Sequence, residues 1–141
     1  MKKILIVNAN YYSDITYNLV KTANKLLKKN KFKVSVISVP GIFEIPIAIR
    51  RNIKNFDSFL ALGCVIKGKT PHFDLICKST FDSILKISIY YNKPIGNGII
   101  TALNIKQAKE RCGKIKSSKK NKGLEAANAV MSIMNNGPKK I

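Results

Sequence analysis

Four short apolar runs alternate with segments of helical periodicity along the chain, and this alternation constrains the fold more than any other feature. The runs predict strands at Lys3–Ala9, Phe32–Val39, Phe59–Ile66 and Pro94–Thr101. Lys3–Ala9 is almost continuously apolar, which is typical of a strand buried on both faces of a parallel sheet. Strands that each lead into a helix indicate right-handed crossover connections. We therefore expect an α/β fold, a three-layer αβα sandwich with a four-stranded parallel sheet and helices on both faces.

Apolar residues at helical spacing occupy the segments that follow the strands. They predict helices over Asp14–Lys29, from Phe43 to Ile53 with Pro46 in the opening turn, from Pro71 to about Tyr91, over Asn104–Cys112, and from about Lys120 to Asn136. Lys114–Lys122 (KIKSSKKNK) is the one charge-dense, loop-like segment. A chain of 141 residues suits one domain over residues 1–141 that buries roughly two-thirds of its unfolded surface.

The net charge of +19 is the most unusual feature of the composition. It is compatible with nucleic acid, an acidic membrane, an anionic substrate or simply a lysine-biased proteome. Aromatic residues do not interleave with the lysines as they do on single-strand-binding surfaces, so we expect no nucleic-acid partner. No apolar run approaches the roughly 20 residues of a membrane span and no leader sequence is visible, so we expect no membrane association.

Cysteine and acidic residues argue against disulfides and metals. Cys64, Cys77 and Cys112 are widely spaced and odd in number, which fits neither a disulfide framework nor a metal knuckle and favours a reducing, cytoplasmic location. The seven acidic residues never cluster and the chain has one histidine, so we predict no metal site.

The carboxyl ends of the predicted strands are the place to look for a ligand, because open parallel sheets bind ligands there. This rule nominates Tyr11-Tyr12, Gly41–Glu44, Gly68–His72 and Asn97-Gly98.

The stretch from Gly63 to Asp74 carries the strongest signal. An apolar strand passes through a glycine-containing turn into Thr70-Pro71, which predicts an N-cap followed by the first helical residue. The only histidine, His72, then falls in the first helical turn, where free N–H groups and the helix dipole attract an anion. A base beside an anion seat predicts a small active site, although a solvated histidine at a helix start remains the alternative.

Gly63–Thr70 also satisfies G-x-x-x-x-G-K-[ST], the phosphate-binding loop of nucleotide hydrolases. We interpret this match as accidental, because Cys64-Val65-Ile66 continue a buried strand rather than curling around a phosphate. No second apolar strand ends in an acidic residue that would hold magnesium. Gly96-Asn97-Gly98 lacks the third glycine of a dinucleotide site and indicates a close backbone approach instead.

The remaining candidates have two readings each. Tyr11 and Tyr12 either pack at the end of the sheet or form a platform for a flat heterocycle. Phe43 is expected to face the core, whereas Glu44 suits the hydroxyl groups of a polyol. Lys69, Arg111 and Lys122 are by themselves ordinary solvated cations among 26 basic residues.

Two long motifs carry a resemblance to a known family. Val39–Pro46 (VPGIFEIP) resembles V-P-G-[AS]-F-E-[IL]-P, and Leu62–Asp74 (LGCVIKGKTPHFD) resembles L-G-x-V-I-[RK]-G-x-T-x-H-[FY]-[DE], both of the lumazine synthase family. Asn121-Lys122-Gly123 matches the family's N-K-G near the last helix. The similarity runs from Lys3 to about Met134, and the fold it implies is the same sandwich, of the flavodoxin-like kind.

The resemblance implies a transferase that needs no cofactor. It would condense 5-amino-6-(D-ribitylamino)uracil with 3,4-dihydroxy-2-butanone 4-phosphate to 6,7-dimethyl-8-ribityllumazine, phosphate and water, the penultimate step of riboflavin biosynthesis, with a functional link to riboflavin synthase. A non-catalytic flavin- or pterin-binding protein and a basic nucleic-acid-binding module remain the alternatives.

The resemblance also implies a role for each residue that matches a motif. His72 would move protons, and Tyr11 would stack on the pyrimidine. Phe43 and Glu44 would bind the ribityl chain, Val65 and Ile66 would offer backbone groups to the ring, and the Lys69 and Thr70 backbone amides with Arg111 would hold the phosphate. The remaining substrate-binding positions would be Ile42, Cys64, Asn97 and Lys122.

The chain departs from the family pattern in three places. Asn97 stands where an aromatic residue is common, and Lys69 replaces a small residue. The link between Arg111 and Asn121 is longer than in the shortest family members, a feature associated with assemblies that stop at the pentamer. We therefore expect a homopentamer with active sites between neighbouring subunits.

Overall fold

The computed structural model describes residues 1–114 and 120–141, and its elements follow the predicted order. They are β1 (Lys3–Ala9), α1 (Ser13–Lys29), β2 (Lys33–Val39), the 3-10 turn η1 (Ile42–Glu44), α2 (Ile45–Arg51), β3 (Ser58–Ile66), α3 (His72–Tyr91), β4 (Ile95–Ala102), α4 (Ile105–Arg111) and α5 (Lys122–Asn135). Of the predicted loop Lys114–Lys122, residues 115–119 lie outside the described residues and Lys122 already belongs to α5. The predicted α/β fold is confirmed.

The sheet has the strand order β2-β1-β3-β4, and every neighbouring pair is parallel. The two central strands, β1 and β3, are buried along nearly their whole length. The chain moves from β1 outward to β2, and then returns to the other side of β1 to form β3. This reversal leaves a crevice beyond the carboxyl ends of β1 and β3, which is where sheets of this kind bind ligands.

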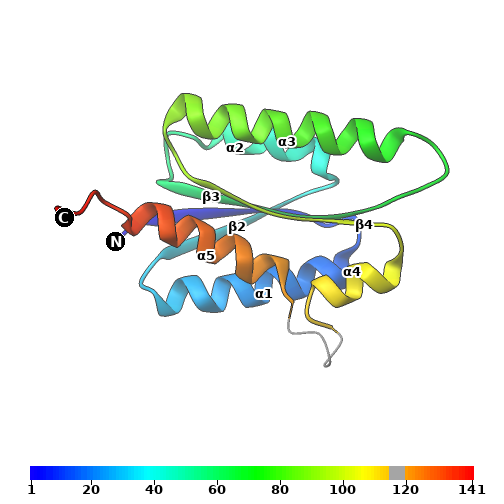
Figure 1. The fold of residues 1–141 in the computed structure, drawn as a ribbon, viewed down its shortest axis with the longest axis horizontal. Coiled ribbons are helices and arrows are strands. Elements are labelled where there is room, and N and C mark those ends of the chain that lie inside the picture. The colour runs from blue at the N-terminus through cyan, green and yellow to red at the C-terminus, as the bar shows by residue number, and fades with distance from the viewer. Residues whose placement is uncertain (115–119) are drawn as a thin grey trace.

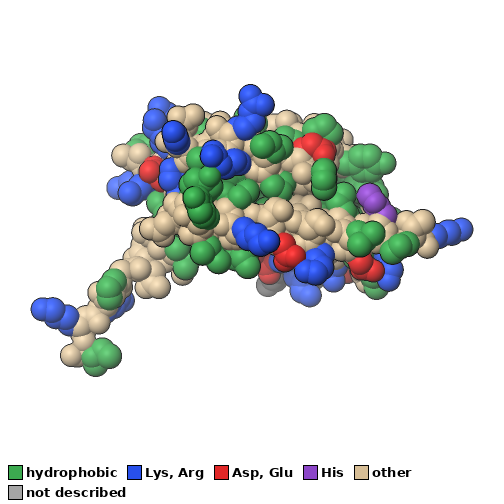
Figure 2. Space-filling model, turned by 90° about the horizontal axis from the view of Figure 1, so that it is seen from above, with side chains coloured by type: hydrophobic (Ala, Val, Ile, Leu, Met, Phe, Trp, Pro, Cys, Tyr) green, Lys and Arg blue, Asp and Glu red, His purple; other side chains and the backbone are tan. Residues whose placement is uncertain are grey.

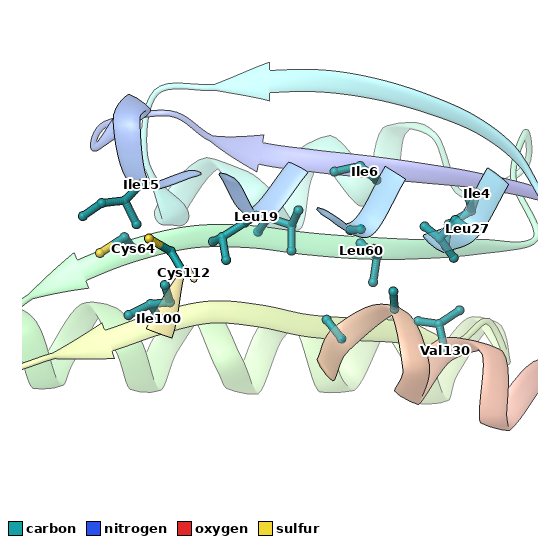
Figure 3. Packing of buried hydrophobic residues seen from close by; sticks show 14 of the residues in the cluster. Ile4, Ile6, Ile15, Leu19, Leu27, Leu60, Cys64, Ile100, Cys112 and Val130 are labelled. Atoms are coloured by element: carbon teal, nitrogen blue, oxygen red, sulfur yellow. The ribbon is translucent and has the colours of Figure 1, made fainter. Parts of the chain in front are cut away.

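One helical layer, formed by α1, α4 and α5, covers the face of the sheet opposite α2 and α3 (Figure 1). Ile15, Leu19, Ala23 and Leu27 of α1 repeat every four residues and are fully buried. They pack with Ile4, Ile6, Leu60, Ile100 and Val130 in one apolar cluster (Figure 3). The space between this layer and the sheet is therefore filled by buried apolar side chains.

Glycines in β4 let α5 approach this face closely. A Cβ on Gly96 would lie 2.5 Å from the carbonyl oxygen of Ala126 in α5, and a Cβ on Gly98 would lie 3.1 Å from the Ala126 Cβ. The close approach expected at Gly96-Asn97-Gly98 is therefore present, and the element that approaches is α5.

The other layer, formed by η1, α2 and α3, covers its face of the sheet but leaves much of its own outer surface apolar. Of the 20 residues of α3, only Cys77, Thr80 and Ile84 are buried. Large apolar side chains remain exposed along this layer, and Figure 2, which looks onto it, shows them as green patches crossing the surface. They are Phe43, Ile47, Leu75, Leu85, Ile89 and Tyr90.

In the described part of the chain, no helix combines the length and the apolar character that crossing a bilayer requires. The same residues bring together no group of three or more His, Cys, Asp or Glu side chains that suits a metal ion.

Candidate active site

A pocket of about 340 Å³ lies at the crevice between the ends of β1 and β3. We call it the aromatic pocket. The segment after β1, the turn before η1, the end of β3 and the first turns of α3 all contribute to its wall. Its lining residues are Ala9, Tyr11, Tyr12, Gly41, Ile42, Cys64, Val65, Ile66, His72 and Ile76. Six predicted site residues thus meet in one place: Tyr11, Ile42, Cys64, Val65, Ile66 and His72.

His72 is the first residue of α3, and its exposed imidazole lines the aromatic pocket. The predicted N-cap at Thr70 is wrong by one residue. The Leu75 N–H donates to the Pro71 carbonyl at 3.2 Å, so Pro71 supplies the first helical acceptor and is itself the cap residue. The Thr70 hydroxyl accepts only a long bond from the His72 N–H, at 3.4 Å. The first turn of α3 therefore begins at His72, whose own N–H is directed at the Thr70 hydroxyl.

β3 supplies the floor of the aromatic pocket. It runs without interruption through Gly63 to Ile66, so the interpretation of the phosphate-loop match as accidental is confirmed. A Cβ on Gly63 would lie 2.9 Å from the Ile42 side chain, and so glycine is what allows η1 to close against β3. Burial, with smaller contributions from Cys112 and Asp14, raises the pKa of the Cys64 thiol to about 12. Cys64 is therefore a neutral wall of the pocket and not a nucleophile at neutral pH.

Phe43 and Glu44 do not line the aromatic pocket. The prediction that Phe43 faces the core is wrong: its side chain is 64% exposed, because the 3-10 turn buries Ile42 instead, at 4%. The Glu44 carboxylate accepts the Gly41 N–H at 3.0 Å, which holds the turn. Phe43 and Glu44 line a separate hollow of about 340 Å³, the η1–α3 hollow, with Pro46, Ile47, Ser79, Thr80 and Ser83.

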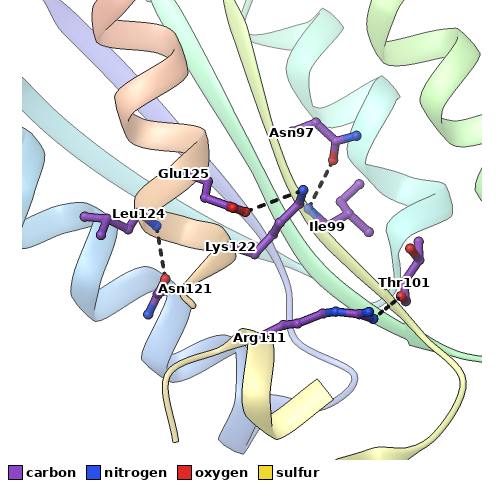
Figure 4. A network of polar contacts seen from close by, with 8 residues as sticks. All are labelled: Asn97, Ile99, Thr101, Arg111, Asn121, Lys122, Leu124 and Glu125. Atoms are coloured by element: carbon purple, nitrogen blue, oxygen red, sulfur yellow. Dashed lines mark hydrogen bonds and ion pairs between the residues drawn. The ribbon is translucent and has the colours of Figure 1, made fainter. Parts of the chain in front are cut away.

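A third depression of about 350 Å³, the cationic pocket, lies beside β4 and brings together three more predicted residues: Asn97, Arg111 and Lys122. Arg111 Nη1 donates to the Thr101 carbonyl at 2.9 Å, and Lys122 lies 3.7 Å from the Glu125 carboxylate (Figure 4). The Asn97 side-chain oxygen accepts the Ile99 N–H at 3.0 Å. The other lining residues are Phe81, Ile99, Ile100, Thr101, Lys120 and Glu125.

In the described part of the chain, the aromatic and cationic pockets share no lining residue. Lys69 and Thr70 are exposed in the loop before α3 and line none of the three hollows. Tyr12, which the sequence nominated with Tyr11 as a possible platform for a heterocycle, lines the aromatic pocket as well. Sequence reasoning placed no site role on Ile76, although it also lines this pocket. The sequence could have identified Ile76 as a pocket residue, because it stands four residues after His72 in the same helix and so lies on the same helix face.

Comparisons with known proteins agree with the geometry. The family model described as 6,7-dimethyl-8-ribityllumazine synthase matches residues 1–137. A 6,7-dimethyl-8-ribityllumazine synthase of Campylobacter curvus is 37% identical over 139 residues, covering 95% of this chain and 87% of the relative. One of Campylobacter jejuni is 39% identical over 138 residues (94% and 88%), and one of Bartonella tribocorum is 38% identical over 134 residues (93% and 87%). The chain therefore belongs to the 6,7-dimethyl-8-ribityllumazine synthase family.

Proposed function

We propose that the aromatic pocket is where this chain carries out the reaction of its family, the condensation of 5-amino-6-(D-ribitylamino)uracil with 3,4-dihydroxy-2-butanone 4-phosphate to 6,7-dimethyl-8-ribityllumazine. The observation that carries the proposal is the meeting of the lone imidazole, His72, with the Tyr11 ring and the end of β3 in one pocket. The aromatic ring suits a flat pyrimidine, and the end of the strand offers backbone groups to its polar edge.

The chemistry needs only proton transfer and positioning. An amine attacks a ketone, phosphate leaves and a ring closes, and all these steps are heterolytic changes between groups that the substrates already carry. In this proposal His72 gives and takes protons, since histidine titrates near neutral pH. Orientation contributes up to about 7–11 kcal/mol, whereas general acid–base catalysis contributes about 10²- to 10⁴-fold in rate. Positioning is therefore the larger contribution.

The phosphate ester requires a positively polarised seat near the imidazole. The first turn of α3 supplies free N–H groups beside His72, and helix N-termini favour anions. None of the described residues that line the aromatic pocket is a lysine or an arginine, however. The Arg111 and Lys122 side chains, which suit a phosphate, line the cationic pocket instead.

We propose that a second subunit supplies these cations, in a homopentamer whose active sites lie between neighbours. The cationic pocket of one subunit would then close the aromatic pocket of the next. The exposed apolar side chains of the α2/α3 layer support such an assembly, because contiguous apolar surface marks contact sites.

The direct test mixes the two substrates with the purified chain and follows lumazine formation by absorbance. We expect product with the wild-type chain and much slower formation with His72→Ala. Binding of flavin or of the pyrimidine without any product would overturn the enzymatic proposal in favour of a binding protein. Particle mass from light scattering tests the assembly, since a monomer or a shell of megadalton mass contradicts the pentamer.

Complementation tests whether the site is shared. His72→Ala and Arg111→Ala damage different pockets, so a co-assembled mixture contains some sites with both wild-type halves. Random mixing in equal amounts restores about one quarter of the sites. The expected result is that the mixture exceeds the activity of either variant alone, whereas mixing His72→Ala with a Tyr11→Ala chain restores nothing. If neither mixture recovered activity, the proposal that two subunits share each active site would be contradicted.

Three broader features belong to the same proposal. Residues 1–141 act as one domain, because both helical layers pack on the same sheet. A reducing, cytoplasmic location fits three cysteines that are all free thiols.

A functional link to riboflavin synthase follows from the expected product, and would be tested by coupling the two activities in one reaction.

A further inference from the structure

Tyr12 is an aromatic residue of the aromatic pocket to which the proposed reaction assigns no role. Its ring is half-buried, lines the pocket and packs against the apolar cluster under α1. The neighbouring Tyr11, which would stack on the pyrimidine, is 76% exposed. The two consecutive tyrosines therefore differ in how firmly the protein holds them.

The backbone of Tyr12 is anchored at the start of α1. Its carbonyl accepts the N–H groups of both Ile15 and Thr16 at 3.0 Å, and both of these residues are fully buried. The carbonyl of Tyr12 is thus the first acceptor of the 17-residue helix. A ring attached to such a fixed backbone position, with core side chains behind it, has little freedom to move.

Tyr12 is in aromatic contact with Tyr11. The ring centroids lie 5.0 Å apart with an interplanar angle of 78°, the edge-to-face arrangement that aromatic pairs favour. In the described part of the chain neither hydroxyl has a hydrogen-bond partner, so the ring contact alone links the two side chains. The exposed Tyr11 ring therefore takes its orientation from Tyr12.

The Tyr12 ring is an uncharged part of the pocket wall at neutral pH. Burial, followed by the proximity of Tyr11 and Cys64, raises the pKa of Tyr12 above its ordinary value. The Cys64 thiol beside it is also neutral, because its pKa is raised to about 12. A neutral aromatic wall suits a flat, uncharged heteroaromatic ring and offers nothing to a phosphate.

We propose that Tyr12 is a positioning residue that holds the Tyr11 ring in the orientation needed to stack on the pyrimidine substrate. This inference rests on the proposed function of the aromatic pocket. It restricts the effect of Tyr12 to one of the two substrates, since a neutral aromatic wall offers nothing to the phosphate group of the other. It also assigns the effect to the aromatic ring and not to the hydroxyl group.

The test compares Tyr12→Leu with Tyr12→Phe in steady-state kinetics. Tyr12→Leu is expected to raise KM for the ribitylaminouracil about 3- to 10-fold, the value of one edge-to-face contact. KM for the butanone phosphate and kcat stay within about 2-fold, and Tyr12→Phe matches the wild type because it keeps the ring. Tyr17→Leu, which removes an exposed tyrosine further along α1, is the matched control and should change neither KM.

A double-mutant cycle separates positioning from a general structural effect. Once Tyr11→Ala has removed the ring that Tyr12 holds, adding Tyr12→Leu should weaken pyrimidine binding no further. Additive losses, equal increases in both KM values, or a Tyr12→Phe variant as weak as Tyr12→Leu would each overturn the proposal.

Equilibrium titration with the pyrimidine alone repeats the comparison without turnover. If the wild-type chain forms no lumazine, the proposed function fails, but the titration still decides the role of Tyr12. If lumazine forms and the titration curves of wild type and Tyr12→Leu coincide, only the present inference fails.

Discussion

The aromatic and cationic pockets are nearly equal in size, about 340 and 350 Å³, but opposite in character. The first is walled by rings and strand ends and holds the only histidine of the chain, whereas the second holds Arg111, Lys120 and Lys122. One substrate of the family reaction is a flat, neutral heterocycle and the other is an anionic ester. Each pocket thus has the chemistry for one substrate and lacks it for the other.

The two helical layers differ in a parallel way. Both layers close over a buried core, but the outer surfaces of their long helices differ: α1 and α5 expose Tyr17 and Ile133, whereas η1, α2 and α3 expose six large apolar side chains, among them Leu85 at 60% and Ile89 at 72%. The proposed assembly would account for both features, because contact with another subunit would cover the exposed apolar surface and bring the two pockets together. The predictions below test whether the pockets depend on each other across such a contact.

The largest effect is expected from charges placed on the exposed apolar layer. If the proposed subunit contact forms on this layer, Leu85→Asp with Ile89→Asp would bury two carboxylates in it, at a cost of several kcal/mol each. We expect the assembly to fall apart and the activity to drop by more than about 10³-fold, because the phosphate cations leave the site. Sedimentation and the lumazine assay measure both effects.

The control for this variant is Ile133→Asp, which places the same charge on α5 of the other layer at a residue that is 61% exposed. It should keep the mass and the activity of the wild type. If the Leu85→Asp, Ile89→Asp protein were a fully active monomer, one subunit would build a complete active site. The idea that each pocket serves only one substrate and needs a neighbour's pocket would then be wrong.

His72→Ala tests the aromatic pocket directly. Loss of the proton-transfer group should slow turnover by about 10- to 10³-fold without abolishing it, since positioning remains. The pH dependence gives a second measure, because the wild-type rate should change between pH 6 and 8 and the variant rate should not. A wild-type rate that stays constant over this range would refute the role of His72.

Local patterns predicted most of the fold. β1 and the end of β3 lie where the apolar runs place them, because burial on both faces of a parallel sheet leaves a continuous signal in the sequence. The helices follow from spacing in the same way. Thr70 failed as a cap because cap geometry depends on a turn of only a few residues, which helical periodicity does not report.

The arrangement of the site was less predictable. Placing His72 at the end of the sheet required only the order of the elements, and the structure agrees. Separating Asn97 and Arg111 from the aromatic pocket required the strand order, which puts β4 at the edge of the sheet, and sequence spacing does not contain that order. Phe43 was misplaced for a related reason, since a single 3-10 turn decides whether it or Ile42 points inward.

Arg111→Ala tests the cationic pocket and should have a smaller effect than loss of the imidazole. A charged hydrogen bond contributes about 1.5–3 kcal/mol, so kcat/KM for the butanone phosphate should fall by roughly 10- to 100-fold. Binding of the pyrimidine alone should not change. Arg111→Lys keeps the charge but loses the planar fork and the bond to the Thr101 carbonyl, and should recover only part of the loss.

The smallest effect is expected at the ion pair that connects the two pocket-bearing segments within one subunit. Lys114, just after α4, lies 3.1 Å from Asp14 in the first turn of α1. Exposed pairs of this kind contribute little, so Asp14→Asn should change kcat/KM by less than about 2-fold. A large loss would show that the pockets are coupled inside the subunit and that a neighbour is unnecessary.

The pH dependence of stability provides an independent check on the same pair. The hydrogen bond from Lys114 lowers the pKa of the Asp14 carboxyl below its ordinary value. A lowered pKa in the folded state stabilises the protein above the ordinary carboxyl range, and the contribution disappears as the pH falls through the lowered pKa. The Tm difference between wild type and Asp14→Asn should therefore be small at pH 7 and vanish in acid. A difference that grows on acidification would mean that Asp14 acts through some group other than Lys114.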